Sequence, residues 1–148
     1  MPNQDEWQKI LTERLAALPA LAADQVRLFR IQSSRSVTPA PWLAQMQAEN
    51  GMAAASGRWF SSHPDALAFY AEDVDHPELV TLDVSSTEAE ACRLTQLPKV
   101  LADGSRPWAF SRDPETEHFI PAEWKARQRR WSLRTEDVPM ERRRRLSR

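Results

Sequence analysis

Short apolar segments with the pattern of β-strands recur along this chain and are separated by segments with the pattern of helices. Residues 26–31 alternate in the manner of a strand, residues 58–61 form a short apolar stretch, and residues 78–84 and 116–120 are rich in aliphatic and aromatic side chains. Alternating side chains reach opposite faces of a sheet. Strands separated by helices and long loops predict an α+β fold with a sheet at its centre.

The segments between the strands carry helix signals. Apolar residues at spacings of three and four predict an amphipathic helix over residues 4–18, which Pro19 ends. Ser62 or His63, followed by Pro64, has the pattern of a helix start, and this helix is expected to continue to residue 72. Further helices are predicted over residues 42–48, 87–94 and 121–131.

The composition is typical of one soluble globular domain. The 148 residues, of which 41% are hydrophobic and 28% charged, match a domain of about 100–150 residues. No apolar run approaches the roughly 20 residues of a membrane helix. The start of the chain, Met1 to Trp7, is polar and acidic and lacks a signal-peptide pattern. We therefore expect a cytoplasmic protein, or one delivered into a target cell without a cleaved signal peptide.

Several common functional motifs are absent from the sequence. Only 3 glycines occur, and neither a phosphate-binding Gly-rich loop nor a G-x-S-x-G motif is present. The single cysteine, Cys92, excludes an intramolecular disulfide and a multi-cysteine zinc site. His63, His76 and His118 have no metal-ligand spacing. We expect no metal.

The charge is unevenly distributed along the chain. Residues 1–121 hold ten basic and seventeen acidic residues, giving −7, whereas residues 122–148 hold ten basic and four acidic ones, giving +6. The basic end includes Arg142-Arg143-Arg144-Arg145. Residues 132–148 are predicted to be a basic tail, and its candidate partners are nucleic acid, an acidic protein or the acidic body of the chain itself.

An acidic pair stands before the last predicted strand. Glu115-Thr116-Glu117 precedes His118-Phe119-Ile120-Pro121, although glutamates are poor strand formers. Two residues that are two apart on an extended segment point the same way, so both carboxylates are expected to face one cleft. A solvated strand entrance is the plainer interpretation. Arg30 lies upstream in an apolar segment, and Ser61-Ser62 follows two aromatic residues.

This order of residues resembles the Arg-Ser-Glu branch of the mono-ADP-ribosyltransferase family, over roughly residues 26–124. In that branch the arginine lies on the first core strand, and the serine belongs to a Ser-Thr-Ser motif on the second. The catalytic glutamate ends a Glu-x-Glu or Gln-x-Glu motif before an apolar strand. Arg30, Trp59-Phe60-Ser61-Ser62 and Glu115-x-Glu117 are similar to these three elements.

The resemblance implies a single domain over residues 1–131, with a split mixed or antiparallel sheet and flanking helices. It implies NAD as substrate and a protein acceptor, which Glu115 suggests is an arginine, and it is compatible with a bacterial toxin or effector. Glu117, Glu115 and Ser61 would be catalytic. The residues expected to bind NAD are Arg30, Ser62, Phe60, Trp59 and Tyr70, and those expected to face the acceptor are Trp108, Phe110 and Arg112.

The chain also departs from the family pattern, and alternatives stay open. The Ser-Thr-Ser motif is reduced to Ser61-Ser62, with His63 in the third position, so either serine could fill the role. Arg27 could replace Arg30 from the other face of the strand. Tyr70, Trp108 and Phe110 have the alternative of a place in the core. A catalytically silent relative, or a small binding module that uses its basic tail, are the competing functions.

Overall fold

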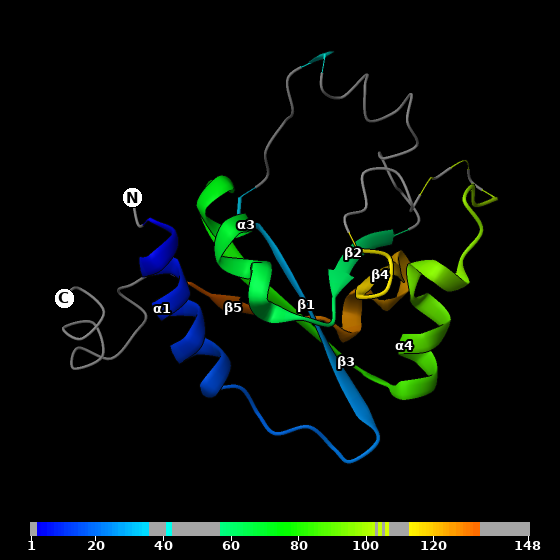
Figure 1. Ribbon diagram of the computed structural model, residues 1–148, viewed down its shortest axis with the longest axis horizontal. Coiled ribbons are helices and arrows are strands. Elements are labelled where there is room, and N and C mark those ends of the chain that lie inside the picture. Colours follow the sequence, from blue (N-terminus) through cyan, green and yellow to red (C-terminus); the bar gives the residue numbers. More distant parts are fainter. Residues whose placement is uncertain are drawn as a thin grey trace.

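The computed structural model describes residues 3–35, 41–42, 57–102, 104, 106 and 113–133. Its described strands form one five-stranded sheet in the order β4-β2-β1-β3-β5, in which all neighbours are antiparallel (Figure 1). The predicted α+β class is therefore confirmed. The elements are α1 (Gln4–Ala16), β1 (Gln25–Ser33), β2 (Gly57–Ser61), η1 (Pro64–Ala66), α3 (Leu67–Asp73), β3 (Pro77–Ser85), α4 (Ser86–Cys92), η2 (Leu94–Gln96), β4 (Glu117–Pro121), η3 (Ala122–Arg127) and β5 (Arg129–Ser132).

Helices cover both faces of the sheet, with α1 and α3 on one face and α4 on the other (Figure 1). We call these the α1–α3 face and the α4 face. The α1–α3 face carries Ile31 and Leu79, which pack against apolar residues of both helices. The α4 face carries Leu28, Val80 and Leu82, which pack with Ala89 and Cys92. Because β3 is buried on both sides, its sequence is an almost continuous apolar run.

Local signals account for the helix starts. Asn3 caps α1, since its Oδ1 accepts a hydrogen bond from the Glu6 backbone N–H at 2.9 Å. Ser85 and Glu88 form a capping box at the start of α4, each side chain accepting from the backbone N–H of the other residue. Pro64 opens the turn that leads into α3, as predicted.

The helix predicted over residues 121–131 is wrong. A 3₁₀ segment, η3, is followed there by β5, which pairs with β3 and places Trp131 opposite Leu79. The Trp131 Nε1–H donates to Thr81 Oγ1 at 2.9 Å. An edge of β3 that needs a backbone partner outweighed the helical preference of this segment.

The other predicted element boundaries differ less from those in the structure. The predicted N-terminal helix ends at Ala16 rather than at residue 18, and the helix predicted over residues 42–48 falls mostly outside the described residues. The tail predicted from residue 132 begins later, because Ser132 belongs to β5 and Leu133 is fully buried. Residues 134–148 lie outside the described part of the chain.

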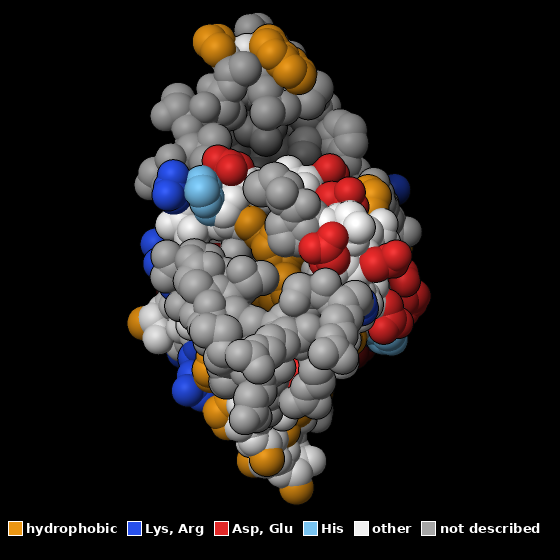
Figure 2. Space-filling model, turned by 90° about the vertical axis from the view of Figure 1, so that its left-hand side faces the viewer, with side chains coloured by type: hydrophobic (Ala, Val, Ile, Leu, Met, Phe, Trp, Pro, Cys, Tyr) orange, Lys and Arg blue, Asp and Glu red, His pale blue; other side chains and the backbone are white. Residues whose placement is uncertain are grey.

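Charge is segregated in space as well as along the sequence. The end of α3 and the turn after it expose Glu72, Asp73 and Asp75, while η3 and β5 expose basic side chains such as Lys125 and Arg129. In the view of Figure 2, acidic side chains gather at the right and basic ones at the left. No helix among the described residues is both long enough and apolar enough to cross a membrane.

Candidate functional site

Strand pairing places Arg27, Ser61 and Glu117 on one face and at one end of the sheet. Ser61 pairs with Phe29 on one side and with Glu117 on the other. Side chains of directly paired residues lie on the same face, and Arg27 shares that face because it is two residues from Phe29. Since β1 begins, β2 ends and β4 begins at this end of the sheet, we call the group the Arg27–Ser61–Glu117 site.

Arg27 is held in a fixed orientation. Its Nε and Nη2 donate to the two carboxylate oxygens of Asp83, directly opposite on β3, at 2.7 and 3.0 Å. Nη2 also donates to the Pro19 carbonyl at 2.6 Å. The hydrogen bond with Asp83 raises the pKa of Arg27. The Nη1 group has no partner among the described residues, and 12% of the Arg27 side chain is exposed.

Asp83 was not singled out by the sequence analysis. It is a single carboxylate within the apolar run from Leu79 to Val84. An acidic residue inside such a run signals a fixed cationic partner, because burying an unpaired carboxylate is costly. Only the register of β1 and β3 identifies that partner as Arg27 rather than Arg30.

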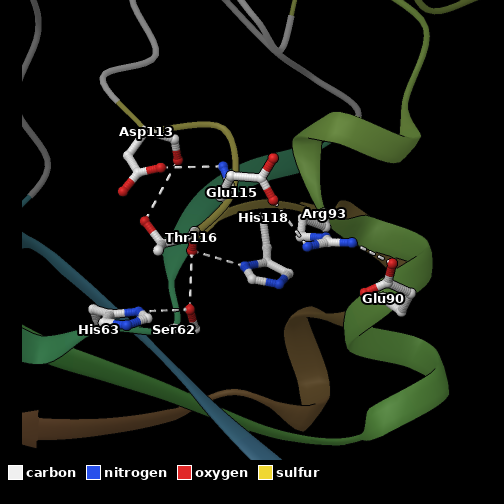
Figure 3. A network of polar contacts seen from close by, with 8 residues as sticks. All are labelled: Ser62, His63, Glu90, Arg93, Asp113, Glu115, Thr116 and His118. Carbon is white, nitrogen blue, oxygen red and sulfur yellow. Dashed lines mark hydrogen bonds and ion pairs between the residues drawn. The ribbon is translucent and has the colours of Figure 1, made fainter.

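The two serines at the end of β2 have different surroundings. Ser61 Oγ accepts from the His63 N–H and donates to the His63 carbonyl, both at 3.1 Å. Ser62 instead bonds the turn before β4, because its N–H and its Oγ donate to the Thr116 carbonyl at 2.9 and 3.3 Å (Figure 3). Ser61 therefore lies beside Glu117, while Ser62 joins the end of β2 to the turn that precedes Glu117.

Glu115 does not share a strand with Glu117. Residues 113–116 form a turn in which the N–H groups of Thr116 and Glu117 donate to the Asp113 carbonyl at 3.2 and 3.0 Å. β4 begins only at Glu117, so the expectation that both carboxylates point into one cleft from an extended segment is wrong. The Glu115 carboxylate is 69% exposed and accepts from Arg93 Nη1 at 3.1 Å (Figure 3).

His118 supports the same turn from the α4 face. It is buried, and its Nδ1 lies 3.0 Å from the Thr116 carbonyl, which fits the tautomer with a proton on Nδ1. Burial lowers the pKa of His118, Arg93 lowers it further, and the hydrogen bond and Glu90 oppose this shift. His118 thus has a structural role that its isolation from the other histidines in the sequence did not reveal.

Arg30 lies on the opposite face of the sheet from Glu117, so its predicted place in a common cleft is wrong. It neighbours Phe29 on β1 and pairs with Val80, and its Nη1 donates to the Trp59 carbonyl at 3.1 Å. The apolar face that Arg30 shares with Val26 and Leu28 favoured Arg30 over Arg27. Both faces of this sheet are covered, however, so an apolar face does not identify the cleft.

The aromatic residues predicted to bind NAD also lie on different faces of the sheet. Phe60 is buried on the α4 face, which corrects its expected position in the NAD cleft. Trp59 lies on the face of Ser61 and packs edge-to-face on Phe119, with ring centroids 5.2 Å apart. Tyr70 is 38% exposed beside Phe69, so it is not a core residue. Trp108, Phe110 and Arg112 lie outside the described residues.

The described residues contain no group of three or more His, Cys, Asp or Glu side chains that could hold a metal ion. Comparisons with protein-family models, with curated proteins and with solved structures found no match.

Proposed function

We propose that this protein is an NAD-dependent mono-ADP-ribosyltransferase that modifies a protein side chain, with arginine as the favoured acceptor. One observation carries the proposal, namely the register that puts Arg27, Ser61 and Glu117 on one face and at one end of the sheet. These are the three residue types of the family pattern, in the same chain order, with Arg27 in the place first assigned to Arg30.

The residue types fit the chemistry of the transfer. The bond between nicotinamide and the ribose C1 breaks, nicotinamide leaves with the bonding electron pair, and an oxocarbenium-like centre develops at C1. A side-chain nitrogen of the acceptor then forms the new bond to C1 and loses a proton. The Glu117 carboxylate stabilises the developing positive charge and accepts a hydrogen bond from a ribose hydroxyl.

Arg27 and Ser61 have supporting roles in this proposal. The two hydrogen bonds that Arg27 donates to the Asp83 carboxylate orient its guanidinium, and its Nη1 group is left to bind the NAD pyrophosphate. Ser61 pairs directly with Glu117 across β2 and β4, and in this proposal its hydroxyl would exchange the His63 carbonyl for the Glu117 carboxylate. Trp59 and Phe119 supply an apolar wall on the same face.

The favoured acceptor follows from the surroundings of Glu115. Its exposed carboxylate already accepts a hydrogen bond from the guanidinium of Arg93. A guanidinium from a target protein would form the same charge-assisted hydrogen bond. Glu115 is therefore assigned to the acceptor side, and Glu117 to NAD.

Nicotinamide release from NAD, with and without an arginine acceptor, tests this function. Glu117→Gln should lower NAD hydrolysis about 100-fold or more, because a charge that stabilises the transition state is lost. Glu115→Gln is the matched control and should spare most hydrolysis while reducing transfer to arginine. Circular dichroism would verify that both variants fold.

Unchanged hydrolysis in a folded Glu117→Gln protein would contradict the assignment of this residue. A folded wild-type protein that binds NAD but never releases nicotinamide would instead indicate the catalytically silent relative. A protein that ignores NAD but binds nucleic acid in a salt-dependent manner would indicate the binding module with a basic tail.

A further inference from the structure

A cavity lies on the α4 face, at the end of the sheet opposite to the Arg27–Ser61–Glu117 site. Its volume is about 460 Å³, and its polar lining consists of Gln32, Arg58, Lys125, Gln128 and Arg130. Gln32 lies near the end of β1, Arg58 near the start of β2, and η3 forms the outer wall. This volume falls within the range of about 300–1,000 Å³ that small-molecule sites occupy.

Positive charge is concentrated around this cavity. Arg58, Lys125 and Arg130 line it, and Arg30 lies beside it, hydrogen-bonded to Gln32 at 3.3 Å. Glu78 is an acidic group next to Arg130; it is buried and accepts hydrogen bonds from Arg130 Nε at 2.7 Å and Gln32 Nε2 at 2.9 Å. Glu123 of η3 is exposed and does not line the cavity. Three cations thus line the cavity and a fourth lies beside it.

Arg30 is a largely buried cation beside this cavity, close to the charge of Arg58. It donates hydrogen bonds to the Trp59 carbonyl and to Gln32 Oε1, neither of which is a carboxylate. Burial and the nearby charge of Arg58 lower the pKa of Arg30 to about 10. Lys125, which is exposed, forms no ion pair among the described residues. An anion between these groups would reduce the repulsion between the guanidinium groups.

The remaining lining indicates what else the ligand carries. Ile120, Pro121 and Ala122 form an apolar wall, and the amides of Gln32 and Gln128 offer both donors and acceptors. Such a mixture suits a molecule with a phosphate at one end and a sugar or flat ring system at the other. Guanidinium groups bind phosphate oxygens with two parallel hydrogen bonds, and lysine binds them as a point charge.

We propose that this cavity binds the phosphate group of a small phosphorylated molecule of about nucleotide size, with Arg58 and Lys125 on the phosphate and Ile120–Ala122 against its apolar part. The site is separate from the proposed transfer site, because the two lie on opposite faces and at opposite ends of the sheet. A ligand bound here would not reach Glu117.

Isothermal titration calorimetry with inorganic pyrophosphate, ADP and adenosine at low salt tests this site. The wild-type protein should bind pyrophosphate and ADP but not adenosine. Lys125→Gln and Arg58→Gln should each raise the pyrophosphate Kd about tenfold or more, as expected for a lost charge-assisted hydrogen bond. NAD hydrolysis should stay unchanged in the Lys125→Gln protein.

Arg129→Gln is the matched control. It makes the same change in net charge one residue from Arg130, but Arg129 lies over the Trp131 ring, on the α1–α3 face. The Kd of pyrophosphate should therefore stay unchanged in this variant.

Three results would overturn the proposal. The first is a wild-type protein that binds neither pyrophosphate nor ADP. The second is an equal loss of affinity in Lys125→Gln and Arg129→Gln, which would indicate attraction to overall charge alone. The third is a preference of more than about tenfold for a single-stranded oligonucleotide over ADP, which would indicate a nucleic-acid surface instead.

Discussion

Arg27 and Arg30 are the same residue type on the same strand, and the residues opposite them give them different roles. Arg27 pairs with Asp83, which neutralises and orients it, whereas Arg30 pairs with Val80. Because side chains alternate between the two faces of a strand, residues three positions apart lie on opposite faces. Arg27 therefore joins Ser61 and Glu117, and Arg30 lies beside the basic cavity on the α4 face.

This difference gives a prediction with an internal control. Arg27→Lys should lower kcat/KM for NAD about tenfold or more, because an ammonium cannot reproduce a guanidinium that binds Asp83 and a pyrophosphate at once. Arg30→Lys should leave NAD hydrolysis nearly unchanged. Steady-state kinetics of nicotinamide release measures both. A larger loss in Arg30→Lys than in Arg27→Lys would restore the original assignment.

His118 is expected to make stability depend on pH. Its pKa in the folded protein lies below the ordinary value of 6.5, mainly because of burial, so protonation favours the unfolded chain. The free energy of unfolding should be at its full value above pH 6.5 and should fall as the pH is lowered from there towards the folded-state pKa. Urea denaturation at a series of pH values measures this slope.

Replacement of His118 provides the check. His118→Asn retains a donor for the Thr116 carbonyl but cannot titrate, so the slope below pH 6.5 should become shallower even if the variant is less stable overall. An identical slope in the wild type and in His118→Asn would contradict the role of His118.

At the scale of elements, η3 and β5 are where local preference and the folded structure disagree. Residues 122–127 do form a helix, but it is a 3₁₀ helix rather than an α-helix, and the chain becomes extended from Arg129. β5 covers the edge of β3, and Trp131 and Leu133 reach the cluster under α1 and α3. The burial of these apolar side chains favours the strand more than helix propensity favours a helix.

The contribution of this last strand can be measured at Leu133. Its side chain is fully buried against the cluster of α1 and α3, so Leu133→Ala should destabilise the protein by about 2–5 kcal/mol. Leu21→Ala, at a residue that is 40% exposed, should cost far less. Chemical denaturation compares the two. Equal stabilities would show that the segment after β5 does not contribute to the core.

At the scale of the whole molecule, the basic end beyond Leu133 is expected to lie apart from both sites. The sequence beyond Val138 has few apolar residues and four consecutive arginines, so it has little surface to bury. Deletion of residues 140–148 should leave the melting temperature and NAD hydrolysis nearly unchanged. It should weaken binding to an acidic macromolecule in a salt-sensitive manner. A large fall in melting temperature would show that the segment supports the fold.

Much of the architecture could be predicted from the sequence, because strand patterns are local. The segments around Leu28, Phe60, Leu82 and Phe119 were placed in strands, and they form β1, β2, β3 and β4. The helix start at Pro64 was also predicted. β5 could not be predicted, since the pattern of residues 121–131 does not show that β3 lacks a partner on one edge.

The amino-acid sequence by itself determined the α+β class, the start of most elements and the chain order of the candidate site residues, all of which depend on near neighbours. The tertiary structure alone decided which face each side chain occupies. The register of β1 with β2 and β3 placed Arg27 rather than Arg30 on the face of Ser61, and the turn after Asp113 separated Glu115 from Glu117. A register is set by contacts between residues far apart in the chain, and a shift of one residue reverses every face.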